Sequence, residues 1–263
     1  MKNIIILVLA LVNVFLLGSL VLRKTEDSAS RRQAAAELTA LFASDGITLD
    51  PAALSGQSAP EGRTLNRSVE LDRKLAAFLL GDTATEADKG GGIYGYESDR
   101  GSAQFRASGG FEASGTLSAD NDPETFIRRF CRSFGYESLA MELENGAGSA
   151  TAVQSHNGYP VSNCTVTFTV SGGSVSSLTG THIPDSYTAV DATVPLSVRT
   201  ALTTFLEYRR ESGAVVSAVT DAFPCYELQS TTAAPMTLVP QWGIVTGTGN
   251  YYVNCFTGAV SHG

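Results

Sequence analysis

Histidine is the first side chain to consider, because its imidazole can act as a general base or as a metal ligand at neutral pH. The chain contains three, His156, His182 and His262. None lies in an H-E-x-x-H, G-x-S-x-G or P-loop motif. A serine triad is assembled from positions far apart in a sequence, so a hydrolase stays an open alternative. With no motif in its favour, we predict a protein that is not an enzyme.

The four cysteines are the other reactive side chains: Cys131, Cys164, Cys225 and Cys255. They form no C-x-x-C pair, so the pattern does not indicate a zinc knuckle or a thioredoxin-like site. One interpretation is two disulfides, Cys131–Cys164 and Cys225–Cys255, because each pair falls within one of the repeated units described below. The alternative is four buried free thiols, which suits Cys131 on the apolar face of a predicted helix.

Two further segments were considered as ligand sites. The run Asp120-Asn121-Asp122 is too short for a calcium loop, which needs alternating oxygen ligands over a longer stretch. We expect it to cap a helix. The run Gly90-Gly91-Gly92 is not followed by Lys-Ser/Thr at the spacing of a phosphate-binding loop, and a turn is the better interpretation. The sequence therefore predicts neither a metal ion nor a cofactor.

The elements that hold these residues begin with a strongly apolar segment. Residues 4–22 carry no charge, and at 1.5 Å per helical residue they span about 28 Å, close to the thickness of a bilayer core. A cleaved signal peptide is the alternative. Its apolar region is usually shorter, and no small-x-small cleavage site follows this segment directly, since the next residues are Arg23, Lys24 and Thr25. We predict an uncleaved transmembrane anchor over residues 1–24.

The side of the membrane is argued from charge and cysteines. Counting the basic residues that flank the span would place the large domain in the cytoplasm. The short N-terminal tail and the even number of cysteines favour the other side. We predict a single-pass protein of the cell membrane with its large domain extracytoplasmic.

The charge of the chain excludes one class of partner. Lys and Arg total 18 and Asp and Glu total 26, which gives a net charge of −8. An acidic chain is a poor ligand for the phosphates of DNA or RNA, so we expect no nucleic-acid binding.

After the anchor, the pattern predicts an α+β protein. Residues 25–64 read as a stalk helix and a linker. Three units follow, at 65–118, 119–190 and 191–263. Each begins with a predicted helix, at 65–80, 123–134 and 195–212, and continues into short strands separated by glycines. Such strands are typical of antiparallel meanders that pack under a helix.

Three segments then resemble a known family. The stalk ends in DGITLD (45–50), and the strands include AVQSHNGYPVSNCTVTFTVSGGSVSSLTG (152–180) and LVPQWGIVTGTGNYYVNCFTGAV (238–260). Together with the anchor, these segments resemble the YycI and YycH proteins of Gram-positive bacteria. The last two also resemble PepSY-type modules more broadly.

The resemblance implies a regulator without catalytic residues. Its partners would be a sensor histidine kinase of a cell-wall two-component system and a paralogous regulator. The alternative function is an extracellular PepSY-like module that binds or inhibits a peptidase or a cell-wall protein.

Two groups of residues are candidates for partner contact. In the anchor, Asn13 can hydrogen-bond to a neighbouring helix, and Gly18 allows close approach on another side. The alternative for Asn13 is an isolated amide without a partner. In the last predicted hairpin, Trp242, Tyr251 and Tyr252 are side chains that favour interfaces. The alternative there is core packing under the third helix, with one of the two tyrosines exposed by strand alternation.

Overall fold

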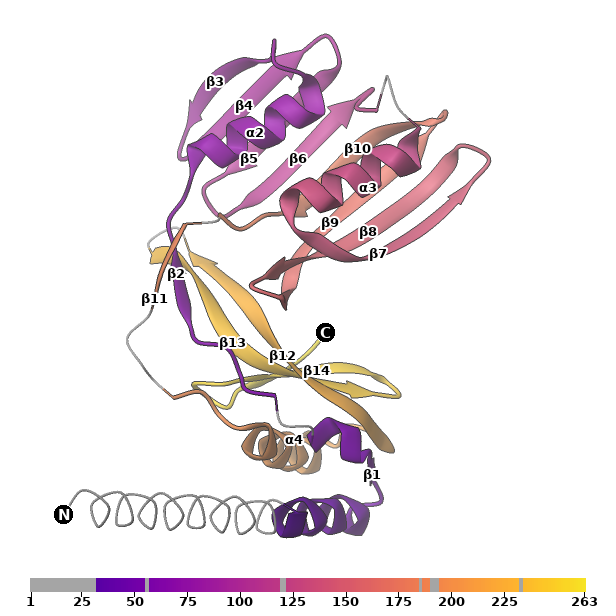
Figure 1. Ribbon diagram of the computed structural model, residues 1–263, viewed down its shortest axis with the longest axis vertical. Helices are drawn as coiled ribbons and strands as arrows, with labels where there is room; N and C mark the ends of the chain where they lie inside the picture. Colours follow the sequence, from indigo (N-terminus) through magenta and orange to yellow (C-terminus); the bar gives the residue numbers. More distant parts are fainter. Residues whose placement is uncertain (1–31, 55–56, 119–121, 185, 190–193, 232–233) are drawn as a thin grey trace, which may run out of the picture.

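The computed structural model describes residues 32–54, 57–118, 122–184, 186–189, 194–231 and 234–263. It is a mixed α+β structure in which two layered modules lie one above the other (Figure 1). The upper one, called the tandem module here, comprises α2, α3 and β3–β10. The lower one, called the base module, comprises a helix at residues 32–44 together with β1, η1, β2, β11, α4 and β12–β15.

The first half of the tandem module is α2 (Val69–Leu80) followed by β3 (Thr85–Gly90), β4 (Ile93–Ser98), β5 (Gly101–Arg106) and β6 (Gly110–Gly115). The sequence placed the start of the helix at Leu65. It begins at Val69 because the Ser68 side chain accepts a hydrogen bond from the Leu71 amide and caps the first turn. Leu65 belongs to β2 (Arg63–Leu65) instead.

The second half repeats this order with α3 (Pro123–Phe134), β7 (Tyr136–Glu144), β8 (Ala147–His156), β9 (Tyr159–Ser171) and β10 (Ser174–Thr181). Asp122 caps α3, Pro123 opens it, and Gly135 ends it in the left-handed conformation at φ 70°. These caps are the ones that the sequence predicts.

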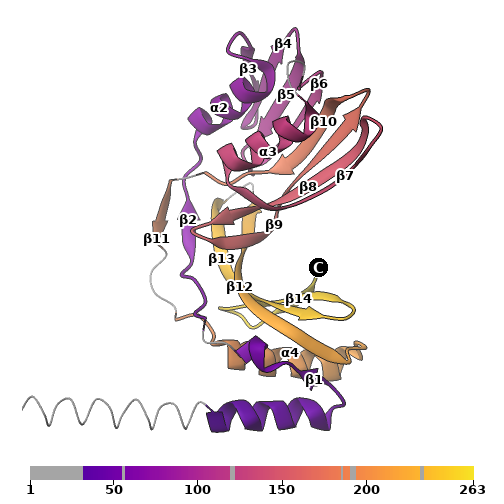
Figure 2. The ribbon, with the colours of Figure 1, turned by 45° about the vertical axis from the view of Figure 1, so that its right-hand side comes forward.

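Pairing of β6 with β10 joins the two halves into one antiparallel sheet, ordered β7-β8-β9-β10-β6-β5-β4-β3. Both helices cover the same face of this sheet (Figures 1 and 2). Strand alternation in β9 shows how the sequence selects that face. Cys164, Val166, Phe168 and Val170 are buried, whereas the threonines between them point to solvent.

In the base module, β12 (Ala218–Thr231) and β13 (Ala234–Thr246) form a long antiparallel pair. One end of β13 pairs with β14 (Gly249–Asn254), which in turn pairs with β15 (Val260–His262). The other end pairs with β2. Strand β1 (Thr48–Leu49) runs parallel to β12, and the short helix η1 (Pro51–Leu54) follows it.

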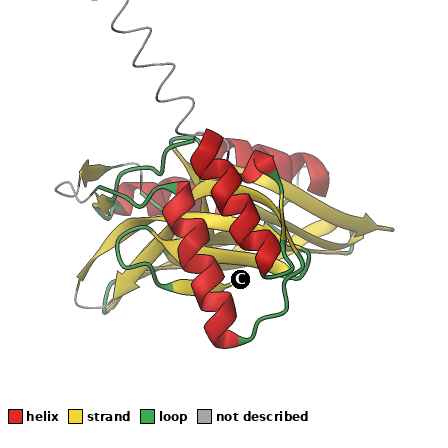
Figure 3. Ribbon diagram, turned by 90° about the horizontal axis from the view of Figure 1, so that it is seen from below, coloured by secondary structure: helices red, strands yellow, loops and turns green. Residues whose placement is uncertain are grey.

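Two helices lie on one side of the base sheet, α4 (Val198–Ser212) next to the strands and the helix of residues 32–44 below α4 in Figure 1; Figure 3 shows this side of the molecule. Leu38, Phe42 and Ile47 share one core cluster with Phe205 and Trp242. The segment read as a stalk and linker therefore packs, from residue 38 onward, in the same core as the third predicted unit.

The tandem module is an insertion in the base module. Strand β2 ends just before it and β11 (Tyr187–Ala189) follows it, and the two strands pair antiparallel with Leu65 opposite Tyr187. A further link comes from β9, whose Val161 pairs with Tyr226 of β12. Beside it, the Asn163 amide bonds to both backbone groups of Leu228, each at 2.8 Å.

The predicted anchor, with Asn13 and Gly18, lies outside the described residues. Among the helices of the described residues, none is long and apolar enough to cross a membrane.

Candidate functional site

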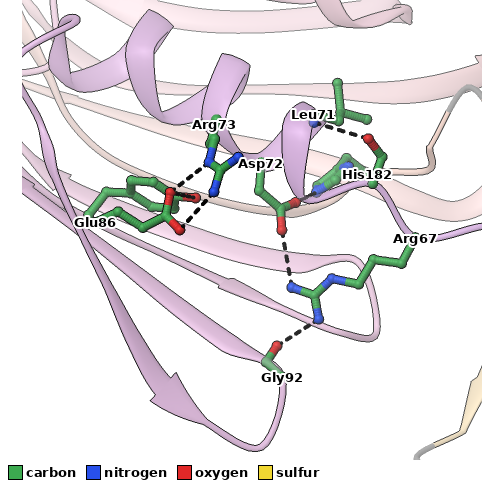
Figure 4. A network of polar contacts seen from close by, with 9 residues as sticks. Arg67, Leu71, Asp72, Arg73, Glu86, Gly92 and His182 are labelled. Atoms are coloured by element: carbon green, nitrogen blue, oxygen red, sulfur yellow. Dashed lines mark hydrogen bonds and ion pairs between the residues drawn. The ribbon is translucent and has the colours of Figure 1, made fainter.

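A network of buried polar groups links α2 to the segment after β10 (Figure 4). One carboxylate oxygen of Asp72 lies 3.1 Å from Nε2 of His182, and the other accepts a hydrogen bond from the Arg67 guanidinium at 3.1 Å. The same guanidinium donates to the Gly92 carbonyl at 2.8 Å. Asp72 and Arg67 together therefore connect the start of α2 with Gly92 and with His182.

The burial of Asp72 and His182 limits the chemistry that this network can perform. The side chains of Asp72 and His182 are 3% and 5% exposed, and the His182 ring meets the rings of Phe105 and Phe111. An Asp–His pair is part of a hydrolase triad, but a substrate needs access to the imidazole. Here the imidazole is enclosed by aromatic rings, which suits a structural junction.

A second set of hydrogen-bonded side chains lies next to the network. The Arg73 guanidinium makes two hydrogen bonds to Glu86, at 2.8 and 3.2 Å, and the Tyr96 hydroxyl donates to the same carboxylate at 3.3 Å. These bonds hold the pKa of Glu86 below its usual value of 4.5, with Arg73 the largest cause. Burial raises the pKa of Tyr96 to about 12.

The lowered pKa of Glu86 gives a pH prediction. Since the folded state favours the charged carboxylate, its stabilising effect is complete above the unfolded pKa and is lost as the pH falls through the folded pKa. We expect the urea midpoint of the native chain to fall more between pH 7 and pH 3 than that of Glu86→Gln. Glu144→Gln, at an exposed position in β7, is the control and should keep the native acid dependence. Parallel curves for all three proteins would contradict this assignment.

The three histidines do not lie together. His182 and His156 both line a cavity of about 130 Å³, which has room for a few water molecules. His156 also meets the Tyr187 ring at 5.0 Å. His262 lies in the base module against Tyr251, with ring centroids 4.6 Å apart. Within the described residues, no group of His, Cys, Asp or Glu is arranged to hold a metal ion.

All four cysteines are buried free thiols in the structure. The pair Cys225–Cys255 is separated by β13, because Gln241 pairs with Cys225 on one side and with Asn254 on the other. Residues two strands apart lie about 9–10 Å from each other, beyond the reach of a disulfide. Cys131 lies in the tandem core, and Cys164 lies in a different cluster where the two modules meet.

Burial should make these thiols unreactive. It raises the pKa of Cys131 to about 11 and that of the other three to about 12. At pH 8 only about a thousandth or less of each would be thiolate, the reactive form. We expect Ellman's reagent to label the native protein more than about a hundredfold more slowly than the protein in guanidinium chloride.

The same measurement separates the two interpretations of the cysteines. Protein isolated without reductant and then denatured should show four titratable thiols. If none is found, all four cysteines have formed disulfides, and the free thiols of the structure would be the wrong assignment.

A groove of about 880 Å³ lies in the base module. It runs between the helix of residues 32–44, η1 and the start of α4. Small and apolar side chains dominate its lining, and they include Ala35, Leu54, Ala59, Leu196 and Trp242. Val194, at its rim, is 85% exposed. Concave apolar surfaces of this size are where ligands and partner segments bind.

The aromatic hairpin is placed mainly in the core. Trp242 is 1% exposed, and its indole N–H donates to the Leu196 carbonyl at 2.8 Å. Tyr251 is 5% exposed and packs against Phe205 and Tyr208. These two residues therefore follow the core-packing alternative. Tyr252 is half-buried on the other face of β14, as alternation requires.

The groove was missed by reasoning from the sequence. Its walls come from three segments, residues 32–39, 51–59 and 194–199, which only the fold brings together. One signal was present, since Trp242 is the single tryptophan of the chain and is one of the residues that line the groove.

Comparison with known proteins adds little to this geometry. No protein-family model matches the sequence, and no curated protein matches it. Among solved structures, an uncharacterized protein from Eubacterium rectale ATCC 33656 is similar at 11% identity with a TM-score of 0.46, over 82% of this chain and 89% of its own. The Bacillus megaterium YpeB C-terminal domain is similar at 14% identity with a TM-score of 0.37, over 75% and 98%. Both TM-scores are below 0.5, so neither similarity carries an argument, and the YycI and YycH resemblance stays a prediction.

Proposed function

We propose that this protein is an extracytoplasmic PepSY-like module that works by contact and that binds or inhibits a peptidase or a cell-wall protein. The observation that carries the proposal is the groove of about 880 Å³ in the base module. It lies in the part of the chain that ends with the PepSY-like segment 238–260. Its apolar lining suits an apolar segment of a partner protein.

The way such contact would work follows from the lining. Ala35 and Ala59 are small and leave space, while Leu54 and Leu196 offer apolar surface at its sides. A partner side chain that entered the groove would lose its contact with water, and burial of apolar area favours association. The indole of Trp242 would then report binding through its fluorescence.

A second candidate function is regulation of a sensor histidine kinase, the partner class that the sequence resemblance implies. One observation favours it. Arg32, in the wall of the groove, is only a few residues after the predicted anchor 1–24. If the anchor spans the membrane, the groove lies near the membrane surface, where the outer part of a kinase would be within reach.

Crosslinking in the producing cells tests both candidates. A photoreactive amino acid is placed at Ala35 in the groove, with the same residue at Thr167, on the exposed face of β9, as the control. The product is identified by mass spectrometry. A peptidase or wall protein captured from Ala35 but not from Thr167 supports the first candidate, and a histidine kinase supports the second.

Two outcomes would show that the groove is not the contact surface. Equal products from Ala35 and Thr167 would show nonspecific capture. A purified partner that binds without changing the Trp242 emission, and that binds an Ala35→Trp variant as well as the native chain, would place the contact elsewhere.

A further inference from the structure

Within the described residues, strand β7 is an open edge of the tandem sheet. It pairs with β8 on one side, and the sheet order ends there (Figure 2). The pairing is regular from Ala140 to Glu144, after a bulge between Glu137 and Ala140. An edge strand offers a row of backbone N–H and C=O groups to any chain that lies beside it.

The hairpin turn shows which backbone groups of β7 point away from β8. Asn145 and Gly146 both have positive φ, 51° and 75°, as a two-residue type I′ turn requires. Its flanking pair, Glu144 and Ala147, exchanges hydrogen bonds, and bonded pairs then alternate along the ladder. Met141 and Leu143 therefore point their N–H and C=O groups away from β8, toward the open side.

The side chains of β7 are sorted by face. Leu139, Met141 and Leu143 are half-buried and pack against the tandem core on the side of α3. Glu142 and Glu144 are exposed on the other face. An added strand would find apolar neighbours on one face and carboxylates on the other.

We propose that the β7 edge binds an extended peptide segment in which basic residues alternate with apolar ones. Its backbone would pair with Met141 and Leu143, its apolar side chains would extend the half-buried row, and its basic side chains would face Glu142 and Glu144. Cross-strand pairs of opposite charge stabilise a sheet, and like charges destabilise it. The net charge of −8 on the chain adds attraction for a cationic segment.

Two other uses of sheet edges fit less well. A second copy of this chain pairing through β7 would bring Glu142 and Glu144 close to their own counterparts. The opposite edge, β3, has every residue exposed and carries Asp88 and Lys89, charges of the kind that protect an edge from pairing. The proposal involves a different module from the groove and does not depend on it.

The test uses a fluorescent seven-residue peptide in which lysine alternates with valine or threonine, and the full-length chain, followed by anisotropy. A second peptide carries glutamate in place of lysine, and a third is the lysine peptide methylated on alternate backbone nitrogens. We expect the lysine peptide alone to bind. The variant E142K/E144K should weaken it by about three- to tenfold and should improve binding of the glutamate peptide. The charge-matched control E97K/E112K, on strands far from β7, should bind as the native chain does.

A protein-side variant tests the strand pairing itself. Leu143→Pro removes one outward N–H at an edge position where proline is tolerated, and it should abolish binding of the lysine peptide. If this variant does not fold, the methylated peptide answers the same question. The proposal would be overturned if the methylated and unmethylated peptides bound equally, or if the two double variants had equal effects. Absence of binding at millimolar peptide would also overturn it, as would a dimer that E142K/E144K disrupts in sedimentation.

Discussion

Replacing Asp72 with alanine should lower the free energy of unfolding by about 3–5 kcal/mol. The reason is that both partners of the lost carboxylate stay where they are. His182 remains enclosed between aromatic rings, and the Arg67 guanidinium, 25% exposed, keeps the Gly92 carbonyl and the face of the Tyr94 ring. Removing one member of a buried ion pair leaves the other without compensation, which costs more than the pair itself contributes. Urea denaturation followed by circular dichroism measures the change.

Two companion variants separate charge from hydrogen bonding. Asp72→Asn keeps an oxygen and a similar volume and should lose less stability than Asp72→Ala. Glu112→Ala removes an exposed partner of Arg106, and exposed pairs contribute about 0–1 kcal/mol. If Asp72→Ala and Glu112→Ala cost the same, the buried network does not hold α2 in place.

Phe130→Ala should destabilise the protein to a similar extent, by about 3–5 kcal/mol. Phe130 is fully buried in α3, and its ring meets five other aromatic rings: Phe78, Phe111, Phe134, Tyr136 and Phe168. These rings come from α2, from both halves of the sheet and from α3 itself. The cavity left by alanine would therefore lie where the two halves of the tandem module meet.

The matched control is Arg132→Ala, an exposed position in the same helix that leaves the packing unchanged. Two signals follow unfolding, the far-UV signal of the whole chain and the emission of Trp242 in the base module. Because β9 pairs with strands of both modules, we expect Phe130→Ala to shift both transitions together. A Trp242 transition that stays at its native midpoint would show that the modules unfold independently.

The parts of the fold that the sequence predicts are those with local causes. Helix α3 follows its Asp122–Pro123 start and its Gly135 end, and α4 ends at Gly213 in the left-handed conformation, as expected. Strands with alternating burial, such as β9, were also recognised. In each case the decisive residues lie within a few positions of the element that they define.

The parts that were missed lack such local causes. All six residues of β3 are exposed, so it has no apolar alternation to detect. Strand β7 contains a bulge after Glu137, which interrupts its period. The three-residue strands β2 and β11 are defined by partners far away in the chain. The groove was missed for the same reason, since the sequence does not show that residues 32–39 lie beside the start of α4.

The pairing of β2 with β11 has a mechanical consequence. Residues 32 and 263, the ends of the described chain, both belong to the base module, and the chain enters and leaves the tandem module through these two strands (Figure 1). Three residue pairs, from Arg63 opposite Ala189 to Leu65 opposite Tyr187, join β2 to β11, and β13 pairs with β2 at Arg63 and Thr64. A force that pulls residues 63 and 189 apart would break these pairs one after another. Until they part, tension bypasses the covalent path through the tandem module, which is also tied to the base module where Val161 of β9 pairs with Tyr226.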